Sequence, residues 1–294
     1  MDAVITYVNG LDPVWQASYE ARIGKKILDK RFRDWGTLRY LLRGIETHMP
    51  YVRNVFLVVS GESQVPSWVD RANLKVILHG DIIPERFLPV FNSTAIEMFL
   101  HRIPGLDEEF IYFNDDMYPV ADCDSSTFFT DGKPSIGFRR HLLACGLYKV
   151  QTRNSDMMAR RALGLRPSPV FLRPQHICSP MLKSECLKVY EAMENEILSS
   201  VSALRERKNL NQYLFLDYMY HKGIAVDRRI SNRHLSLAAS SADKVCMNIE
   251  RPDTSLICIN DVQMPEDKYL RTRELILASF AKRFPVKSRF EIRD

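Results

Sequence analysis

Two short acidic motifs directly follow apolar runs of the chain. Phe110-Ile111-Tyr112-Phe113 leads into Asn114-Asp115-Asp116, and Leu256-Ile257-Cys258-Ile259 leads into Asn260-Asp261. Such runs predict buried strands, and open α/β sheets bind ligands beyond the carboxyl ends of their strands. Carboxylate oxygens suit Mg²⁺ or Mn²⁺. One Asn-Asp pair is equally well explained as a turn, but two copies favour a metal or phosphate site that includes Asp115, Asp116 and Asp261.

Three weaker candidates lie elsewhere in the chain. His176 lies just before a predicted helix, where it can act as a general base or bind phosphate, although a lone histidine is more often structural. Arg205 and Arg207 suit bidentate phosphate contacts, although a basic stretch is more often a solvated surface. Asn92-Ser93 precedes another predicted helix and is suited to ligand contact, but helix capping explains this pair almost as well.

Apolar runs alternate with segments of helical period, which predicts a mostly parallel sheet with helices on its faces. Strands are expected at residues 3–8, 55–59, 74–78, 110–113 and 256–259. Asp34 is expected to cap a helix that ends near Met49-Pro50. Thr94-Ala95-Ile96-Glu97 matches a capping box, and the helix it begins should extend to Ile103 before Pro104-Gly105. A closing helix is expected at residues 265–280.

Residues 154 to 223 lack strand patterns and predict a helical subdomain. Its helices are expected at residues 156–163, from 180 to about 201, and at 210–222, with Ser155 and Ser179 as N-caps and Pro180 at the first helical position. The fold class is therefore an α/β core with a helical insertion. The predicted division is a core over residues 1–150, a helical subdomain over 151–224, and a return to the core over 225–294.

Composition excludes several classes of protein. The net charge of +5 is small and the basic residues are scattered, which argues against nucleic-acid binding. There is no apolar run of membrane-spanning length and no basic segment ahead of an apolar stretch at the N-terminus. The six cysteines form no C-x-x-C pair, which favours reduced thiols in the cytoplasm. The motifs of dinucleotide-binding enzymes, P-loop kinases, serine hydrolases and zincins do not occur.

Four blocks of sequence together resemble the Stealth family of sugar-1-phosphate transferases, which includes bacterial capsule and exopolysaccharide enzymes and the catalytic subunit of the lysosomal-enzyme N-acetylglucosamine-1-phosphotransferase. The first block is Asp2 to Gly10, with Tyr7 where the family commonly has Trp. The second block comprises Arg31-Phe32-Arg33-Asp34, Leu38-Arg39-Tyr40, Pro50 with Val52-Arg53-Asn54, Pro66-Ser67-Trp68, Leu88 to Ser93, Ala95-Ile96-Glu97, His101 to Leu106 and Phe110 to Asp116.

The third and fourth blocks are shorter. His176 with Pro180 matches the family histidine, and Arg205 followed by Asn209-Leu210 matches a family arginine, with Asn209 where Asp is frequent. Arg207 is an alternative alignment for that arginine. The fourth block is Ile257 to Asp261. Residues 122 to 150 are unaligned, and the long additional modules of the lysosomal relative are absent, which implies a minimal bacterial-type enzyme.

The resemblance implies a Rossmann-like, glycosyltransferase-like core and an active centre made of Asp115 or Asp116 with His176, Arg205 and Asp261. It also implies a UDP-sugar or similar donor, and the acidic residues themselves predict Mg²⁺ or Mn²⁺ as the cofactor. Asn9, Gly10, Arg39, Asn92 and Ser93 are the expected donor-side contacts.

The expected reaction transfers a sugar-1-phosphate from the donor to a sugar hydroxyl in capsule or exopolysaccharide synthesis and releases the nucleoside monophosphate. The alternatives are a metal-dependent glycosyltransferase that releases the nucleoside diphosphate and a non-catalytic carbohydrate-binding protein. The expected partners are the donor and a saccharide acceptor. Attachment of that acceptor to a lipid, and peripheral association with the inner face of the cell membrane, are left open.

Overall fold

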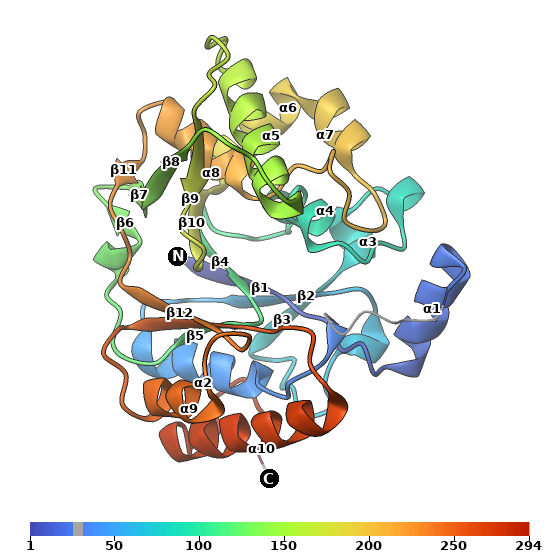
Figure 1. The fold of residues 1–294 in the computed structure, drawn as a ribbon, viewed down its shortest axis with the longest axis vertical. Helices are drawn as coiled ribbons and strands as arrows, with labels where there is room; N and C mark the ends of the chain where they lie inside the picture. The colour runs from blue at the N-terminus through green and yellow to red at the C-terminus, as the bar shows by residue number, and fades with distance from the viewer. Residues whose placement is uncertain (26–31, 294) are drawn as a thin grey trace. The chain divides into compact units, whose positions relative to one another are not determined.

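The computed structural model describes residues 1–25 and 32–293 (Figure 1). Arg31, which begins the second block, lies outside the described residues. A five-stranded sheet has the order β10-β4-β1-β2-β3. Its strands are β1 (Asp2–Thr6), β2 (Val55–Val59), β3 (Leu74–Leu78), β4 (Glu109–Asn114) and β10 (Ser179–Leu182).

This sheet is mostly parallel, as the sequence predicts. β1 runs parallel to β2, with Ala3 opposite Val55, whereas β10 runs antiparallel to β4, with Ser179 opposite Tyr112. Every residue of β1 and β2 is buried. Continuous apolar runs suit this position because a parallel strand is covered on both faces. The expected strands near residues 3–8, 55–59, 74–78, 110–113 and 256–259 and the α/β fold class are confirmed.

The remaining strands form smaller sheets. One has the order β12-β13-β5, with β12 parallel and β5 antiparallel to β13. A second has the order β11-β7-β6, and β8 pairs with β9. The strands are β5 (Met117–Pro119), β6 (Phe129–Thr130), β7 (Lys133–Ile136), β8 (Phe138–His141), β9 (Phe171–Pro174), β11 (Val226–Asp227), β12 (Asn232–Ser236) and β13 (Leu256–Asn260).

The chain divides into two compact units, and each draws on segments that are far apart in sequence. The first unit comprises Met1–Asp2, Ile77–Tyr112 and Ser126–Ile230, and the second comprises Ala3–Val76, Phe113–Ser125 and Ser231–Asp294. The division into 1–150, 151–224 and 225–294 stays a prediction.

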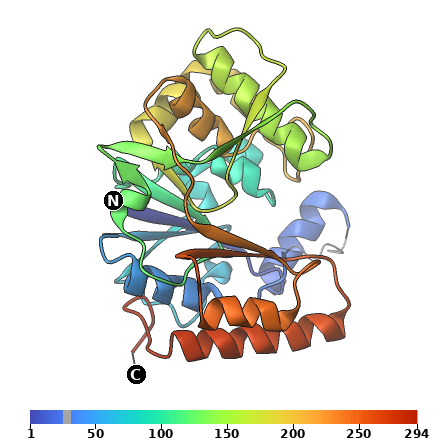
Figure 2. The ribbon, with the colours of Figure 1, turned by 60° about the vertical axis from the view of Figure 1, so that its left-hand side comes forward.

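The helices of the second unit are α1 (Pro13–Ile23), α2 (Leu38–His48), α9 (Ala242–Glu250) and α10 (Glu266–Arg283). Helices α9 and α10 lie side by side (Figures 1 and 2). Helix α2 packs against β5 so closely that a Cβ atom on Gly44 would lie 2.4 Å from the carbonyl oxygen of Pro119. The ring of Tyr40 stacks on Phe280 of α10 at a centroid distance of 5.4 Å.

The first unit holds α3 (His79–Ile82), α4 (Ser93–Glu97), α5 (Leu147–Ala162), α6 (Lys183–Ala192), α7 (Glu194–Ser200) and α8 (Tyr213–His221). Helix α5 packs against α8 and against β9. Gly164 and Gly223 follow α5 and α8 with positive φ angles of 65° and 80°, as expected of glycines just past a helix end. Short 3-10 helices cover Glu62–Gln64, Glu85–Phe87, Leu100–Arg102 and Ser125–Thr127.

Two expected helix starts are wrong. The N-cap of α2 is Thr37, and the carboxylate of Asp34 accepts a hydrogen bond from the backbone N–H of Gly36 instead. The N-cap of α4 is Asn92, whose side chain accepts from the N–H of Thr94. The expected capping box is absent, because the carboxylate of Glu97 accepts from a distant backbone N–H rather than from its own helix start. Helix α4 ends at Glu97, well short of Ile103.

Two more caps in the expected helical subdomain are wrong. Ser155 lies inside α5 and donates to the carbonyl oxygen of Gln151 one turn earlier. Ser179 and Pro180 belong to the edge strand β10, where proline is tolerated because one side of an edge strand needs no ladder hydrogen bond. The sequence prediction also omitted β12 and α9. The strand β12 was missed because Asn232–Ser236 is polar.

A buried ion pair ties α2 to the C-terminal segment of the second unit. The guanidinium of Arg43 donates two hydrogen bonds of 2.7 Å to the two carboxylate oxygens of Glu291 and a third to the carbonyl oxygen of Phe284. Glu291 is 3% exposed. Burial raises the pKa of Glu291, but the hydrogen bonds and charge of Arg43, together with hydrogen bonds from Ser288, outweigh this effect, and the pKa is lowered overall.

Replacing Glu291 with Ala should destabilise the protein by about 3–5 kcal/mol, because the charge of Arg43 would remain buried without its partner. Urea unfolding measures this loss. The folded-state pKa of Glu291 is lowered below the unfolded value, so its contribution is present above the unfolded pKa and disappears as pH falls through the folded pKa. The difference between wild type and Glu291→Ala should therefore shrink in acid.

The matched control is Asp267→Ala, which breaks an exposed pair with Arg271 on α10. It should leave the unfolding midpoint unchanged, because an exposed ion pair adds little. Equal midpoints for Glu291→Ala and Asp267→Ala would contradict the stabilising role of the buried pair.

Candidate functional site

The turn that joins β4 to β5 carries Asp115 and Asp116. Tyr118 donates a hydrogen bond of 2.9 Å to the carbonyl oxygen of Asp115 and closes the turn. Burial of its carboxyl group raises the pKa of Asp115 to about 8, and the like charges of Asp116 and Asp34 add to the rise. Asp34 is therefore a member of this acidic group. Its place in the second block was the sequence signal, which the helix-cap prediction obscured.

Asp116 is held from β13. Its carbonyl oxygen accepts the N–H of Ile259 at 2.8 Å, and its Oδ2 accepts the thiol of Cys258 at 3.5 Å. Its other carboxylate oxygen, Oδ1, is buried and has no hydrogen-bond partner among the described residues. A buried carboxylate oxygen without a donor is costly, so it marks a place for a proton or a cation.

Asp261 follows β13 and belongs to the same electrostatic group. Its Oδ1 accepts the N–H of Val262 at 2.6 Å. Burial raises its pKa and Asp116 raises it further, against the opposing effects of Trp35 and Arg33. The antiparallel pairing of β13 with β5, with Cys258 opposite Met117, explains the coupling, because β5 begins directly after the turn that carries Asp115 and Asp116. The structure thus brings the two acidic motifs of the sequence together.

The donor set of these carboxylates fits a divalent cation. They are hard oxygen ligands with little compensating positive charge, because the nearby Arg33 already pairs with Glu266 at 2.7 Å. The ligand oxygens of Asp115, Asp116 and Asp261 do not all lie within 4.8 Å of one another in the described chain. A cation would therefore engage two of these carboxylates, or all three after side-chain rotation.

The start of α10 fixes the Arg33-Asp34-Trp35 segment. Tyr269 donates a hydrogen bond of 2.9 Å to the carbonyl oxygen of Asp34. The guanidinium of Arg33 lies over the Tyr269 ring at 4.3 Å, and the ring of Trp35 meets it edge-on at 4.9 Å. Tyr7 adds a hydrogen bond to Asp34, and its pKa is raised by burial and by the charges of Asp34 and Asp115.

The expected donor contacts of the second unit lie in the turn after β1 and on α2. Gln64 binds this turn through the N–H and carbonyl oxygen of Asn9. Gly10 approaches Phe32 so closely that a Cβ atom would lie 2.3 Å from the carbonyl oxygen of Phe32. Close backbone packing therefore explains this glycine. The guanidinium of Arg39 lies 5.0 Å from the ring centre of Trp68.

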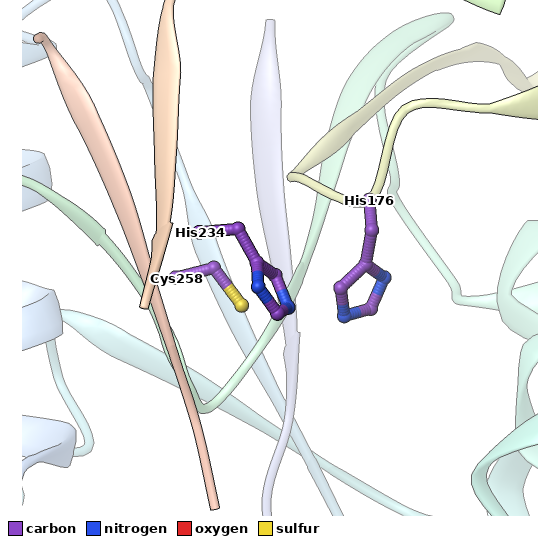
Figure 3. Close-up of side chains that lie close together, drawn as sticks. All are labelled: His176, His234 and Cys258. Atoms are coloured by element: carbon purple, nitrogen blue, oxygen red, sulfur yellow. The ribbon is translucent and has the colours of Figure 1, made fainter. Parts of the chain in front are cut away.

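His234 and Cys258 form a neighbouring pair that the sequence prediction omitted. They lie opposite each other on the parallel strands β12 and β13, and Figure 3 shows both side chains on the same side of these strands. Because side chains alternate along a strand, the predicted strand at residues 256–259 could have indicated which face of the sheet Cys258 is on. His234 could not be found in this way, because β12 carries too few apolar residues to be predicted. His176, also drawn in Figure 3, belongs to the first unit.

Arg205 and Ser93 meet in the first unit. The guanidinium of Arg205 donates to the hydroxyl of Ser93 at 2.6 Å, and Arg205 is exposed. Asn92 is 1% exposed, and its amide donates to Ser202, Leu204 and Asn209 while its oxygen accepts from Thr94. The polar atoms of Asn92 are thus engaged within the protein.

Glu97 lies beneath the Arg205–Ser93 pair. Its carboxylate accepts the N–H of Gln212 at 2.8 Å. Burial raises its pKa to about 7, against the opposing hydrogen bond from Gln212, the charge of Arg205 and hydrogen bonds from Ser93 and Tyr112. The sequence prediction assigned Glu97 to a capping box and so missed this long-range role.

His176 lies in the turn between β9 and β10. Its Nδ1 lies 3.5 Å from the hydroxyl of Tyr213, which shares a 2.6 Å hydrogen bond with Tyr148. Burial raises the pKa of Tyr213, with contributions from Tyr148 and Glu97. The first unit therefore links His176 to the surroundings of Arg205. The carboxylates belong to the second unit, so the structure describes two separate groups of candidate residues.

Comparison with known proteins supplies the family. Residues 31–136 match the family model described as Stealth protein CR2, conserved region 2. The chain is 31% identical to the capsular polysaccharide phosphotransferase WcwK of Streptococcus pneumoniae, over 99% of each chain. A shorter match of 44% identity covers 46% of this chain and 43% of the receptor polysaccharide phosphotransferase WefC of Streptococcus oralis.

Among solved structures, the galactosyltransferase LgtC in complex with donor and acceptor sugar analogs is similar at 13% identity and a TM-score of 0.42, over 95% of this chain and 96% of that chain. A likeness of this size indicates nothing about the reaction. The match to WcwK, by contrast, extends along almost the whole of both sequences and includes the conserved region. The chain belongs to the Stealth protein family.

Proposed function

We propose that this protein is a phosphotransferase of capsular or exopolysaccharide synthesis that moves a sugar-1-phosphate from a nucleotide sugar to a sugar hydroxyl. The similarity to a capsular polysaccharide phosphotransferase over 99% of both chains carries the proposal. The acidic group of the second unit and the Arg205–Ser93 pair of the first unit supply suitable chemical groups. The proposed donor is UDP-linked.

The proposed reaction forms one bond and breaks one. The acceptor hydroxyl oxygen attacks the phosphorus that bears the sugar, and the bond from that phosphorus to the nucleoside monophosphate breaks. The bond between the sugar and its phosphate survives, so the product is a phosphodiester. Catalysis of such a transfer depends chiefly on positioning and on neutralising charge.

Asp115, Asp116 and Asp261 would hold Mg²⁺ or Mn²⁺, and the buried, unpaired Oδ1 of Asp116 supports this assignment. Such an ion neutralises charge on the phosphates when bound. Arg205 would bind phosphate oxygens in a fixed orientation, because Ser93 holds one edge of its guanidinium.

The hydroxyl proton would pass to His176 or to an aspartate. His176 suits this task because its ring lies beside Tyr213, which can orient it. Asn9, Gly10, Arg39 and Ser93 would contact the donor, and Asn92 would position Ser93.

The proposed reaction takes place in the cytoplasm, on a saccharide acceptor. No helix among the described residues is long and apolar enough to cross a membrane. The six cysteines, all of which lie in the described part of the chain, form no disulfide bond there, which suits a reducing cytoplasm. A saccharide acceptor linked to a lipid would bring the protein to the inner face of the cell membrane.

The nucleotide product distinguishes the proposed reaction from ordinary glycosyl transfer. Incubation of the full chain with a UDP-sugar, an acceptor saccharide and Mg²⁺ should release UMP, because the phosphate next to the sugar moves with it. Chromatography of the nucleotides measures this. Release of UDP without UMP would instead establish a metal-dependent glycosyltransferase, and no turnover with any donor and acceptor pair would favour a carbohydrate-binding protein.

Arg205→Lys should lower kcat by about a hundred-fold, because lysine cannot donate two parallel hydrogen bonds to phosphate. Arg207→Lys is the matched control, since Arg207 is also exposed and is the alternative alignment to the family arginine. It should retain nearly full activity. Steady-state kinetics and melting temperatures of both variants make the test. A large loss in Arg207→Lys alone would transfer the role to Arg207.

A further inference from the structure

The segment from β8 through α5 combines exposed leucines with an excess of positive charge. Leu142 and Leu143, in the loop between β8 and α5, have 66% and 74% of their surface exposed. Gly146 ends the loop as the N-cap of α5, with a φ angle of 80°. Figure 2 shows this loop leading into α5. Two adjacent leucines in water are unfavourable unless a partner covers them.

Basic residues surround this loop in sequence. Residues 138–166 contain seven Lys and Arg side chains but a single acidic residue, Asp156, which is fully buried. Arg160 pairs with Asp156, and Arg161 pairs with Glu196. The other five form no salt bridge within the described part of the chain, and they are Arg139, Arg140, Lys149, Arg153 and Arg166.

Helix α5 also combines basic and apolar side chains on one face. Lys149, Arg153, Met157 and Arg161 recur every four residues and therefore share one helix face. Arg153, Met157 and Arg161 are exposed. The pKa of His141, at the end of β8, is lowered by burial and by the charges of Arg173, Lys149 and Arg139, which indicates a positive local potential.

We propose that Arg139, Leu142, Leu143, Lys149 and Arg153, here called the basic leucine patch, dock the protein on an anionic lipid bilayer. The two leucines would enter the boundary between headgroups and acyl chains, while the basic side chains bind lipid phosphates. Nucleic acid would satisfy the charges but would leave the leucines in water. The patch lies within one unit, and its docking does not depend on the proposed reaction.

Co-sedimentation of the full chain with vesicles tests the proposal. Wild-type protein should bind vesicles of equal parts phosphatidylglycerol and phosphatidylcholine, should bind phosphatidylcholine alone far less, and should dissociate as salt rises. The double variant Leu142→Ser, Leu143→Ser should bind the anionic vesicles about ten-fold more weakly, because it removes the apolar contribution. Unchanged melting temperature confirms that this variant folds.

Two matched controls make the same types of substitution on α10. Leu270 and Leu275 on α10 are 55% and 46% exposed, and their double Ser variant should bind like wild type. Lys149→Gln with Arg153→Gln should weaken binding, whereas Lys268→Gln with Arg271→Gln, also on α10, should not. Failure of the wild type to bind anionic vesicles would overturn the proposal. Equal binding by the Leu142→Ser, Leu143→Ser variant would overturn it too.

Cys145 allows a fluorescence measurement at the patch itself, because this free cysteine is exposed in the same loop. An environment-sensitive dye attached at Cys145 in a Cys246→Ser background should shift its emission to the blue when anionic vesicles are added. The same dye at Cys246 in a Cys145→Ser background should not shift. A shift at Cys246 alone would show that another face meets the membrane.

Discussion

Crowding of carboxylates at the end of β4 is the constraint on which the rest of the second unit depends. Asp115, Asp116 and Asp34 lie near one another, and the pKa of Asp115 rises to about 8 because burial and like charges oppose its ionisation. Like charges in a poorly solvated place persist only if the surrounding structure holds them. The β13–β5 pairing and the Tyr269 contacts hold them here. The proposed cation would neutralise this repulsion.

The candidate residues of the first unit centre on an exposed positive charge rather than on crowded carboxylates. Arg205 is exposed and held by one hydroxyl, and Asn92 and Asn209 hold the preceding loop through a network of amide hydrogen bonds. Glu97 beneath it has a pKa raised to about 7 by burial. The proposed reaction uses these two patterns for two tasks: fixed carboxylates for a cation and an accessible guanidinium for phosphate.

The sequence predicted the elements whose signal is local and continuous. The apolar runs before Asn114 and Asn260 identified β4 and β13, and the acidic residues after them fall into one electrostatic group. It failed where long-range contacts decide. Asp34 has the right type for a helix cap but binds Gly36 and Tyr7, and Pro180 at the edge of a sheet resembles a helix start. His234 lies on a strand too polar to be recognised without its partner β13.

Binding of Mn²⁺ tests the central claim most directly, because Mn²⁺ can be followed by its paramagnetic resonance without turnover. Titration of the full chain should show a bound ion that Mg²⁺ displaces. Asp116→Asn and Asp261→Asn should lose it while keeping the wild-type melting temperature, and Asp253→Asn, an exposed control that pairs with Arg233, should retain it. Undiminished Mn²⁺ binding in Asp116→Asn would contradict the assignment of the acidic group as the cation site.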